Sequence, residues 1–379
     1  MFIRIRALPV VSALVFALFV SSWQAAAQDK KPAPKVDKAQ QAEIASAVKL
    51  VDDAMAGQPV PADFKFSWVT HLMKGRDGKE YVPFLLLFDQ DQKVPPTATY
   101  YVRVANKATI AEQQKAQATY KAALAKAENE ARLDPENVEL SEAADKVRAQ
   151  APKVEYAFED LKTFNLNGKA GFAFRIPSAI MVPAGDYEVY ILLKEPNANV
   201  KDKKAQPKAA LLKQALTVPD FSVDPLAMSS VLLTKGADTA QQGQQLQTDP
   251  AKNPYVFFQV SADAIPLDPK FDKKAWLSVS LFVYNTGLDS ATSQPNLTAD
   301  FAFYHKADGA EKFFNKTPPQ QLNATNLGAK FDPKTGVFVG TAVPLESFPE
   351  GDYRLEIKIT DKVTGKSKVE NALFTVIPG

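Results

Sequence analysis

Apolar and polar residues alternate with a period of two along most of this chain. From Phe64 to Trp68 every second residue is aromatic and the residues between are polar, which predicts a half-buried strand. Tyr81 to Phe88 is apolar on both faces, as in a strand covered on both sides. Further strands of this half are expected at Thr97 to Ala105, Val154 to Leu166, Gly171 to Ile176, Asp186 to Leu193 and Leu211 to Val218. Short strands divided by Pro and Gly, without alternating helices, predict an antiparallel β-sandwich.

The same pattern resumes after Phe221 and predicts a second sandwich. Its strands are expected at Ala227 to Thr234, Tyr255 to Ala262, Trp276 to Tyr284, Leu297 to His305, Gly336 to Val343, Tyr353 to Thr360 and Lys368 to Ile377. Asn167-Gly168 in the first half is a strong hairpin-turn signal. The chain is therefore predicted to be mainly β, with tandem sandwich modules at residues 60–220 and 221–379.

Two segments change to a helical pattern. Residues 38–56 predict a short helix, with Gly57 and Pro59 as stop signals. Residues 107–150 are rich in Ala, Lys, Glu and Gln without glycine, and Asp134-Pro135-Glu136 divides them. We interpret this segment as a helical hairpin inserted into the first sandwich. We expect it to pack one side on that sandwich, over the outer face of Tyr81 to Phe88.

One segment occurs twice. Ile176 to Leu193 and Val343 to Ile359 align with a single gap, and both contain Pro, then Gly-Asp-Tyr, then an alternating strand. The copies lie about one domain length apart, which supports two related modules.

Within these copies, Pro183-Ala184-Gly185-Asp186-Tyr187 and Pro349-Glu350-Gly351-Asp352-Tyr353 resemble the entry to the penultimate strand of bacterial immunoglobulin-like and fibronectin III-like domains. The resemblance implies that the tyrosine of each copy packs at a corner of its sandwich and that its hydroxyl bonds back to the chain. The structural corner residues are then Gly185, Tyr187, Gly351 and Tyr353. Similar pairs of modules occur in secreted bacterial proteins of unassigned role, and the likeness specifies fold more than function.

The first residues predict export. Arg4 and Arg6 precede an apolar run from Val10 to Val20, and Ala25-Ala26-Ala27 fits a cleavage site. We therefore expect a signal peptide at residues 1–27, followed by a linker and the short helix at 28–59. Removal of the signal leaves 43 basic and 43 acidic side chains. This balance argues against nucleic acid or an anionic membrane as partner, and no later stretch is long enough to span a bilayer.

Candidate catalytic and metal-ligating residues are few. The chain has no cysteine and two histidines, His71 and His305. The strand period places His71 on an outward face, and His305 ends a strand of the other module, so both are expected to be surface residues. The acidic clusters Asp89-Gln90-Asp91 and Asp268 to Asp272 lack a ring of ligands at calcium-loop spacing. No nucleophile, zinc or phosphate-loop motif occurs. We expect no catalytic residues, no metal and no cofactor.

The aromatic side chains of one strand are candidate ligand-binding residues. Leu277, Val279, Leu281 and Val283 are expected to face the core, which leaves Trp276, Phe282 and Tyr284 with two serines on the opposite face. Such a face suits stacking on a sugar ring or packing on a protein. Two interpretations stay open: a binding surface, or an internal interface with the other module or the hairpin. We favour the interface.

The leading hypothesis is a non-enzymatic protein, exported to the periplasm or the medium, with a binding or structural role. Its partner would be a protein or polysaccharide of the cell envelope. One alternative is a carbohydrate-binding or carbohydrate-active accessory protein that uses the aromatic face. Another is a periplasmic assembly factor that acts through the helical hairpin.

Overall fold

The computed structural model describes residues 37–89, 94–152, 154–166, 174–199, 206–236, 249–266, 268–307, 309–327, 332 and 335–379. The expected signal peptide, most of the linker and the Asn167-Gly168 turn lie outside these residues. The chain is mainly β, with 43% strand and 23% helix, and its strands form several antiparallel sheets. The predicted β class is confirmed. Residues 67–218 are called the N-terminal module and residues 227–377 the C-terminal module.

The N-terminal module contains two antiparallel sheets around one core. The inner sheet, which faces the other module, has the order β1-β2-β5. The outer sheet, on the far side of the core, has the order β4-β3-β6-β7. The core lies between them and includes Phe84 and Leu86 of β2 with Val102 and Val104 of β3. The strands are β1 (Ser67–Thr70), β2 (Glu80–Phe88), β3 (Thr97–Asn106), β4 (Phe158–Asn165), β5 (Phe174–Val182), β6 (Gly185–Lys194) and β7 (Ala209–Val218).

The C-terminal module repeats this plan. In its inner sheet β11 pairs with β15 on one side and with β8 and β9 on the other; its outer sheet has the order β10-β17-β16-β12-β13, with β14 also paired to β12. Among the described strands of this module, β10 alone runs parallel to its neighbour. The expected core positions Leu277, Val279, Leu281 and Val283 are buried between the sheets. The strands are β8 (Ala227–Met228), β9 (Leu232–Gly236), β10 (Lys270–Asp272), β11 (Trp276–Tyr284), β12 (Leu297–Ala307), β13 (Ala310–Lys316), β14 (Gln320–Leu322), β15 (Val337–Pro344), β16 (Gly351–Asp361) and β17 (Ser367–Ile377).

The repeated sequence occupies the same position in both modules. It passes from an edge strand of the inner sheet (β5 or β15) to a central strand of the outer sheet (β6 or β16). Tyr187 and Tyr353 are both buried, at 1% and 2% exposure. Each hydroxyl donates a hydrogen bond of 2.8 Å to a carbonyl four residues earlier, that of Pro183 or Pro349. This is the corner geometry that the resemblance implies.

The glycine that precedes each tyrosine by two positions has a conformation that favours glycine. Gly185 has φ +151° and Gly351 has φ +134°. A Cβ added to Gly351 would also lie 2.7 Å from Nε2 of His305, whose ring stacks on Tyr353. The positive φ turns the chain from one sheet to the other without a side-chain clash.

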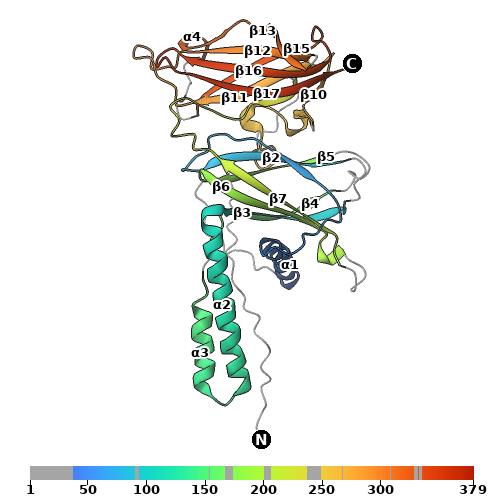
Figure 1. Cartoon of the computed structure of the whole chain (residues 1–379), viewed down its shortest axis with the longest axis vertical. Helices are drawn as coiled ribbons and strands as arrows, with labels where there is room; N and C mark the ends of the chain where they lie inside the picture. Colours follow the sequence, from blue (N-terminus) through green and yellow to red (C-terminus); the bar gives the residue numbers. More distant parts are fainter. Residues whose placement is uncertain are drawn as a thin grey trace.

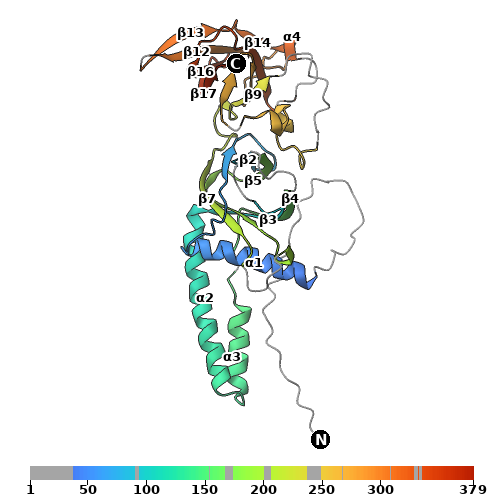
Figure 2. The same cartoon turned by 90° about the vertical axis from the view of Figure 1, so that its right-hand side faces the viewer.

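Helix α1 (Lys38–Met55) covers the outward face of the N-terminal outer sheet (Figures 1 and 2). Asp37 caps it by accepting a 2.8 Å hydrogen bond from the Gln40 N–H. Its buried residues Ala47, Val51 and Ala54 belong to one apolar cluster with side chains of the sheet, among them Tyr101, Tyr190, Leu192 and Leu211. The only other described helices are α2 (Lys107–Leu133), α3 (Val138–Ala149) and the single turn α4 (Ala324–Leu327), apart from short 3-10 turns.

The hairpin of α2 and α3 departs from its expected packing. It is inserted between β3 and β4, as predicted, but projects away from the sandwich at the end opposite the C-terminal module (Figures 1 and 2). The outward side chains Tyr81 and Leu85 of β2 pack instead against residues of the C-terminal module. The prediction that the hairpin covers Tyr81 to Phe88 was wrong, because another module takes that apolar face.

Candidate functional site

The aromatic strand face is mostly internal. Tyr284 is buried at 2% exposure, and its hydroxyl accepts a 3.2 Å hydrogen bond from the Lys74 N–H of the N-terminal module. Phe282 is half-buried, with ring centroids 6.2 Å from Tyr284 and 5.8 Å from Phe258. Trp276, at the far end of the strand, is 38% exposed. The three residues therefore form no open platform, and the geometry agrees with the internal-interface interpretation over most of the face.

The interface between the two inner sheets is an apolar seam. The N-terminal module contributes Met73, Tyr81 and Leu85, all buried. The C-terminal half contributes Leu232 of β9 together with side chains from residues 249–266, namely Tyr255, Phe258, Ala262 and Ile265. Apolar burial on this scale fixes the two modules in one arrangement, because separating them would expose these side chains to water.

The segment expected as a strand at Tyr255 to Ala262 is two 3-10 turns, Val256–Phe258 and Ala262–Ala264. Asn253 holds the first turn: its Oδ1 accepts from the Tyr255 N–H at 3.2 Å and its Nδ2 donates to the Val260 carbonyl at 2.8 Å. The apolar residues point into the seam rather than into a sandwich core. The strand expected at Ala227 to Thr234 is likewise interrupted between β8 and β9.

Hydrogen bonds across the seam add to its apolar packing. Leu72 and Ser230 exchange two bonds of 2.8 Å, one from the Leu72 N–H to Ser230 Oγ and one from the Ser230 N–H to the Leu72 carbonyl. The Tyr81 hydroxyl donates to the Pro254 carbonyl at 3.0 Å. Because these bonds are directional, they restrict sliding of one inner sheet over the other.

His71 lies inside this seam, which corrects the expectation of a surface histidine. It is 9% exposed, and its Nδ1 lies 3.1 Å from the Tyr255 hydroxyl oxygen. Burial lowers the pKa of His71 to about 4, so the ring is neutral near pH 7. The strand period placed it correctly on the outward face, but the C-terminal half covers that face. His305 is half-buried at the Tyr353 corner.

Glu80 fastens the connection between the modules. Its carboxylate accepts from the Gly75 N–H at 3.0 Å and from the Phe221 N–H at 3.2 Å. Burial raises the pKa of Glu80 above its usual value. On the other side of the connection, Nδ2 of Asn285 donates to the carbonyls of Phe221 at 2.6 Å and Asp224 at 2.7 Å. The connection is thus held by both modules.

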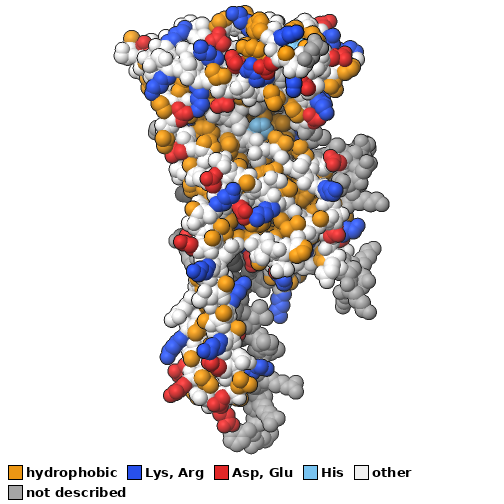
Figure 3. Space-filling view, in the orientation of Figure 1, with side chains coloured by type: hydrophobic (Ala, Val, Ile, Leu, Met, Phe, Trp, Pro, Cys, Tyr) orange, Lys and Arg blue, Asp and Glu red, His pale blue; other side chains and the backbone are white. Residues whose placement is uncertain are grey.

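The α2–α3 hairpin is largely exposed. None of the 27 residues of α2 is buried, and Ala144 alone is buried in α3. At its tip Leu133 and Val138 are 73% and 68% exposed. Residues 128–142 contain six carboxylates and one cation, Arg132, and acidic side chains gather at this end of the molecule (Figure 3). The tip is therefore apolar at its centre and acidic around it.

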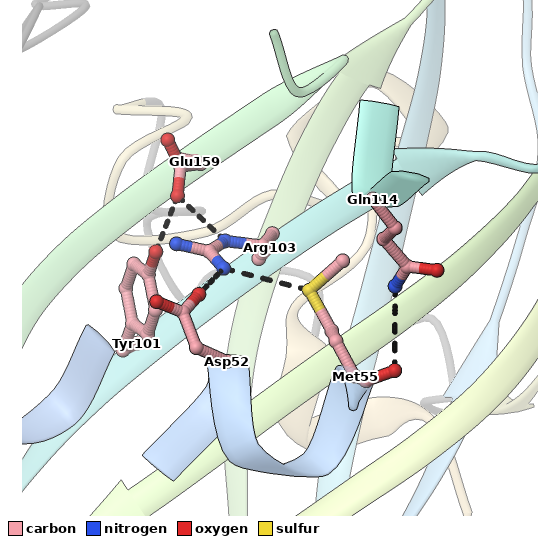
Figure 4. A network of polar contacts seen from close by, with 6 residues as sticks. All are labelled: Asp52, Met55, Tyr101, Arg103, Gln114 and Glu159. Carbon is pink, nitrogen blue, oxygen red and sulfur yellow. Dashed lines mark hydrogen bonds and ion pairs between the residues drawn. The ribbon is translucent and has the colours of Figure 1, made fainter. Parts of the chain in front are cut away.

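The root of the hairpin is attached to β3 and contacts the end of α1, where Gln114 lies beside Met55 (Figure 4). Strand β3 ends at Asn106 and α2 begins at Lys107, and Asn106 Oδ1 caps the helix by accepting from the Ala108 N–H at 2.8 Å. Nε2 of Gln114 donates to the Met55 carbonyl at the end of α1, at 3.3 Å. Since no loop separates β3 from α2, the direction of the strand sets the direction of the helix.

A buried cation connects α1, β3 and β4 beside this root (Figure 4). Arg103 is 1% exposed, with its Nη1 2.5 Å from Asp52 and its Nε 2.8 Å from Glu159. Its guanidinium carbon lies 4.0 Å from the centre of the Tyr156 ring, and the Tyr101 hydroxyl also donates to Glu159. Lys194, also 1% exposed, pairs in the same way with Glu43 of α1 at 2.8 Å.

Arg103, Lys194 and their partners were not among the predicted site residues. A lone arginine inside the apolar strand Thr97 to Ala105 was the available signal for Arg103, because a buried cation requires a counter-ion. Leu133 and Val138 are apolar residues of the predicted hairpin, but their exposure depends on where the hairpin packs.

Within the described residues, no group of three or more His, Asp or Glu side chains lies close enough together to hold a metal ion. The same residues contain no helix long and apolar enough to cross a membrane.

No family model matches the chain, and no curated protein matches it. Among solved structures, trypsin-activated alpha-2-macroglobulin from Escherichia coli is 11% identical, with 84% of this chain and 17% of that chain covered and a TM-score of 0.21. The native conformation of E. coli alpha-2-macroglobulin is 11% identical, with 83% and 14% covered and a TM-score of 0.20. A chain described as pT26-6p is 9% identical, with 89% and 70% covered and a TM-score of 0.19. This chain thus spans less than a fifth of either alpha-2-macroglobulin chain, and TM-scores this low carry no argument about its fold or function.

Proposed function

We propose that this protein is a non-enzymatic exported adaptor, in which two immunoglobulin-like sandwiches form a rigid body and the helical hairpin binds the partner. The observation that carries the proposal is the exposure of Leu133 and Val138 at the end of a projecting hairpin. Exposed apolar side chains on a projecting element are a common feature of protein-binding sites.

The immunoglobulin-like assignment is supported by topology and by the corners. The β4-β3-β6-β7 sheet of one module corresponds strand for strand to β13-β12-β16-β17 of the other. In both, the strand after the corner tyrosine is central in the outer sheet, and Tyr187 and Tyr353 make the same hydrogen bond. This order and this tyrosine corner are typical of immunoglobulin-like sandwiches.

The charge of the hairpin tip defines the kind of partner. Glu128 and Glu130 pair with Arg148 and Lys126. The other four carboxylates of residues 128–142 still outnumber Arg132, which favours a protein surface with basic side chains around an apolar pocket. An anionic lipid surface would repel this tip. The signal-like sequence of residues 1–27 supports a site of action in the periplasm or the medium.

The proposal is tested with a photoreactive amino acid at position 133 in the exported protein, in the cells that produce it. We expect a defined protein adduct that disappears when Glu130 and Glu136 are both changed to Lys. The same label at Val223, which is 75% exposed in the connection between the modules, is the matched control and should give no such adduct.

Two results would contradict the adaptor role. One is the absence of any adduct at position 133. The other is turnover of a common hydrolase substrate by the purified mature protein, provided that a single substitution abolishes the activity without unfolding the chain.

A further inference from the structure

Three of the four sheets are covered on the face that points away from their own core. They are both sheets of the N-terminal module and the inner sheet of the C-terminal module. Helix α1 covers the N-terminal outer sheet, and the two inner sheets share the seam. The C-terminal outer sheet is different: among the described residues, no element lies over its outward face (Figures 1 and 2). This face lies at the end of the molecule opposite the hairpin.

One row of side chains crosses four strands of this open face. Phe313 of β13 is paired with Tyr304 of β12, Tyr304 with Arg354 of β16, and Arg354 with Leu373 of β17. All four point outward because their chain neighbours, such as Phe303, Tyr353 and Phe374, are buried in the core. Phe313 and Leu373, at the two ends of the row, are 58% and 69% exposed. These four residues are called the cross-strand row.

The centre of the cross-strand row is held in one conformation. The Arg354 guanidinium carbon lies 4.1 Å from the centre of the Tyr304 ring. Its nitrogens donate to Glu311 at 2.8–3.0 Å, to Glu356 at 2.9 Å and to Asn371 at 2.7 Å. The charge of the arginine is thereby balanced, and little conformational entropy remains to be lost on binding. Tyr and Arg are also the residue types enriched at interfaces.

The charges beside the row are arranged in opposite pairs across β12 and β16. Lys306 is the cross-strand partner of Asp352 on one side of the row. Asp300 is the partner of Lys358 on the other side. Lys306, Asp352 and Lys358 are exposed and Asp300 is half-exposed.

We propose that the partner of this face is a second copy of the chain, packed face to face about a twofold axis that runs along the strands between β12 and β16. Rotation about this axis places β12 of one copy over β16 of the other. Each β12 side chain therefore faces, in the second copy, the β16 residue that is its cross-strand neighbour within its own chain. Lys306 then faces Asp352 of the second copy, and Asp300 faces Lys358 of the second copy. Tyr304 faces Arg354 and Phe313 faces Leu373 in the same way.

This complementarity fits a self-association. It follows from the opposite charges of strand neighbours, and the twofold axis converts each neighbour pair into an intermolecular pair. Sheets pack face to face with their strands within about 30° of each other, which keeps these pairs in register. A dimer of this kind has a hairpin at each end, because the open face and the hairpin are at opposite ends of each copy. Bivalent binding through two hairpins would rest on the proposed function; the dimer itself does not.

The first experiment measures the mass of the mature protein by sedimentation over a concentration series. The wild type should be dimeric. Leu373→Glu should weaken the dimer at least about tenfold, because each copy would bury a charge against Phe313. Val223→Glu, an exposed apolar residue outside the face, is the matched control and should leave the dimer unchanged.

The second experiment mixes two charge variants. In Asp300→Lys every facing pair at this position becomes Lys–Lys, and in Lys358→Asp every pair becomes Asp–Asp, so each variant alone should dimerise more weakly than wild type. Mixed in equal amounts they should form a heterodimer, in which both facing pairs are again Lys–Asp. Within each variant chain, the cross-strand neighbours at positions 300 and 358 still carry like charges after mixing. Recovery of dimerisation on mixing therefore reports a contact between the two copies.

A wild type that sediments as a monomer at every concentration overturns the proposal. So does a dimer that survives Leu373→Glu, or a pair of charge variants that fails to recover on mixing. If Leu373→Glu instead removes binding of a neutral polysaccharide such as dextran by a monomeric wild type, the face binds sugar and the proposal is wrong. A variant with residues 107–150 replaced by a Gly-Ser loop should still dimerise, which separates this test from that of the hairpin.

Discussion

Nδ1 of His71 lies 3.1 Å from the hydroxyl oxygen of Tyr255, and this contact joins the two modules inside an apolar seam. Burial lowers the pKa of His71 from 6.5 to about 4. Above pH 6.5 the ring is neutral in both the folded and the unfolded chain. As the pH falls from 6.5 to 4 the unfolded chain binds a proton that the folded chain does not, so folding loses up to about 3 kcal/mol of stability.

We therefore expect the melting midpoint to fall between pH 6.5 and pH 4, and to fall less in His71→Asn. Because the chain has two histidines, comparison with this variant assigns the His71 ring in an NMR titration. A titration midpoint of His71 near 6.5 would show that the seam is open to water.

The pair of Arg103 and Asp52 should stabilise the docking of α1. Asp52→Ala leaves the buried guanidinium with Glu159 as its remaining carboxylate partner. Loss of one partner of a buried pair costs about 3–5 kcal/mol; the half-exposed position of Asp52 reduces this to about 1–3 kcal/mol. The matched control is Asp53→Ala on the same turn, whose partner Lys49 is exposed, with an expected cost below about 0.5 kcal/mol. Urea unfolding measures both, and equal effects would contradict a special role for the Arg103 pair.

The two corner tyrosines should contribute equally to their modules. Tyr353→Phe removes the hydrogen bond to the Pro349 carbonyl and should cost about 1 kcal/mol, while Tyr353→Ala should cost about 3 kcal/mol or more. The corresponding changes at Tyr187 should have similar effects. An unchanged free energy of unfolding in Tyr353→Ala would refute the corner assignment.

The hairpin should be dispensable for folding. Val104 of β3 pairs directly with Phe158 of β4, so a short turn can replace residues 107–150. None of the α2 residues is buried. The entropic cost of closing a loop changes by only about 0.6 kcal/mol for each doubling of the loop length. We expect the Gly-Ser replacement to lower the free energy of unfolding by no more than about 2 kcal/mol.

The isolated segment 107–150 is expected to be partly helical by circular dichroism, since it lacks a core of its own. A strand-rich spectrum of the segment, or a replacement variant that does not fold, would contradict this view of the hairpin.

Export should remove the first residues. The small side chains of Ala25 and Ala27 fit the signal peptidase, so the mature protein should begin at Gln28. Mass spectrometry of the exported protein gives its first residue, and a start more than about three residues from Gln28 would refute the predicted cleavage site.

By itself, the sequence determined the features that depend on local periodicity and turn chemistry. The strands around Tyr187 and Tyr353, the buried face from Leu277 to Val283 and the helices on either side of Asp134-Pro135 follow from the spacing of apolar residues and from Gly and Pro, which act over a few residues of chain. The two corners were implied by the resemblance of both Gly-Asp-Tyr copies to immunoglobulin-like domains, and both tyrosines make the corner hydrogen bond.

Only the tertiary structure decided which outward faces are covered. His71 and Tyr284 point away from their own sandwich, and both are buried because the other module packs over them. Phe313 and Leu373 are separated along the chain, and strand pairing places them in one exposed row. Burial of an outward face depends on contacts between residues far apart in sequence, and the local period of two is the same whether such a face meets water or another sheet.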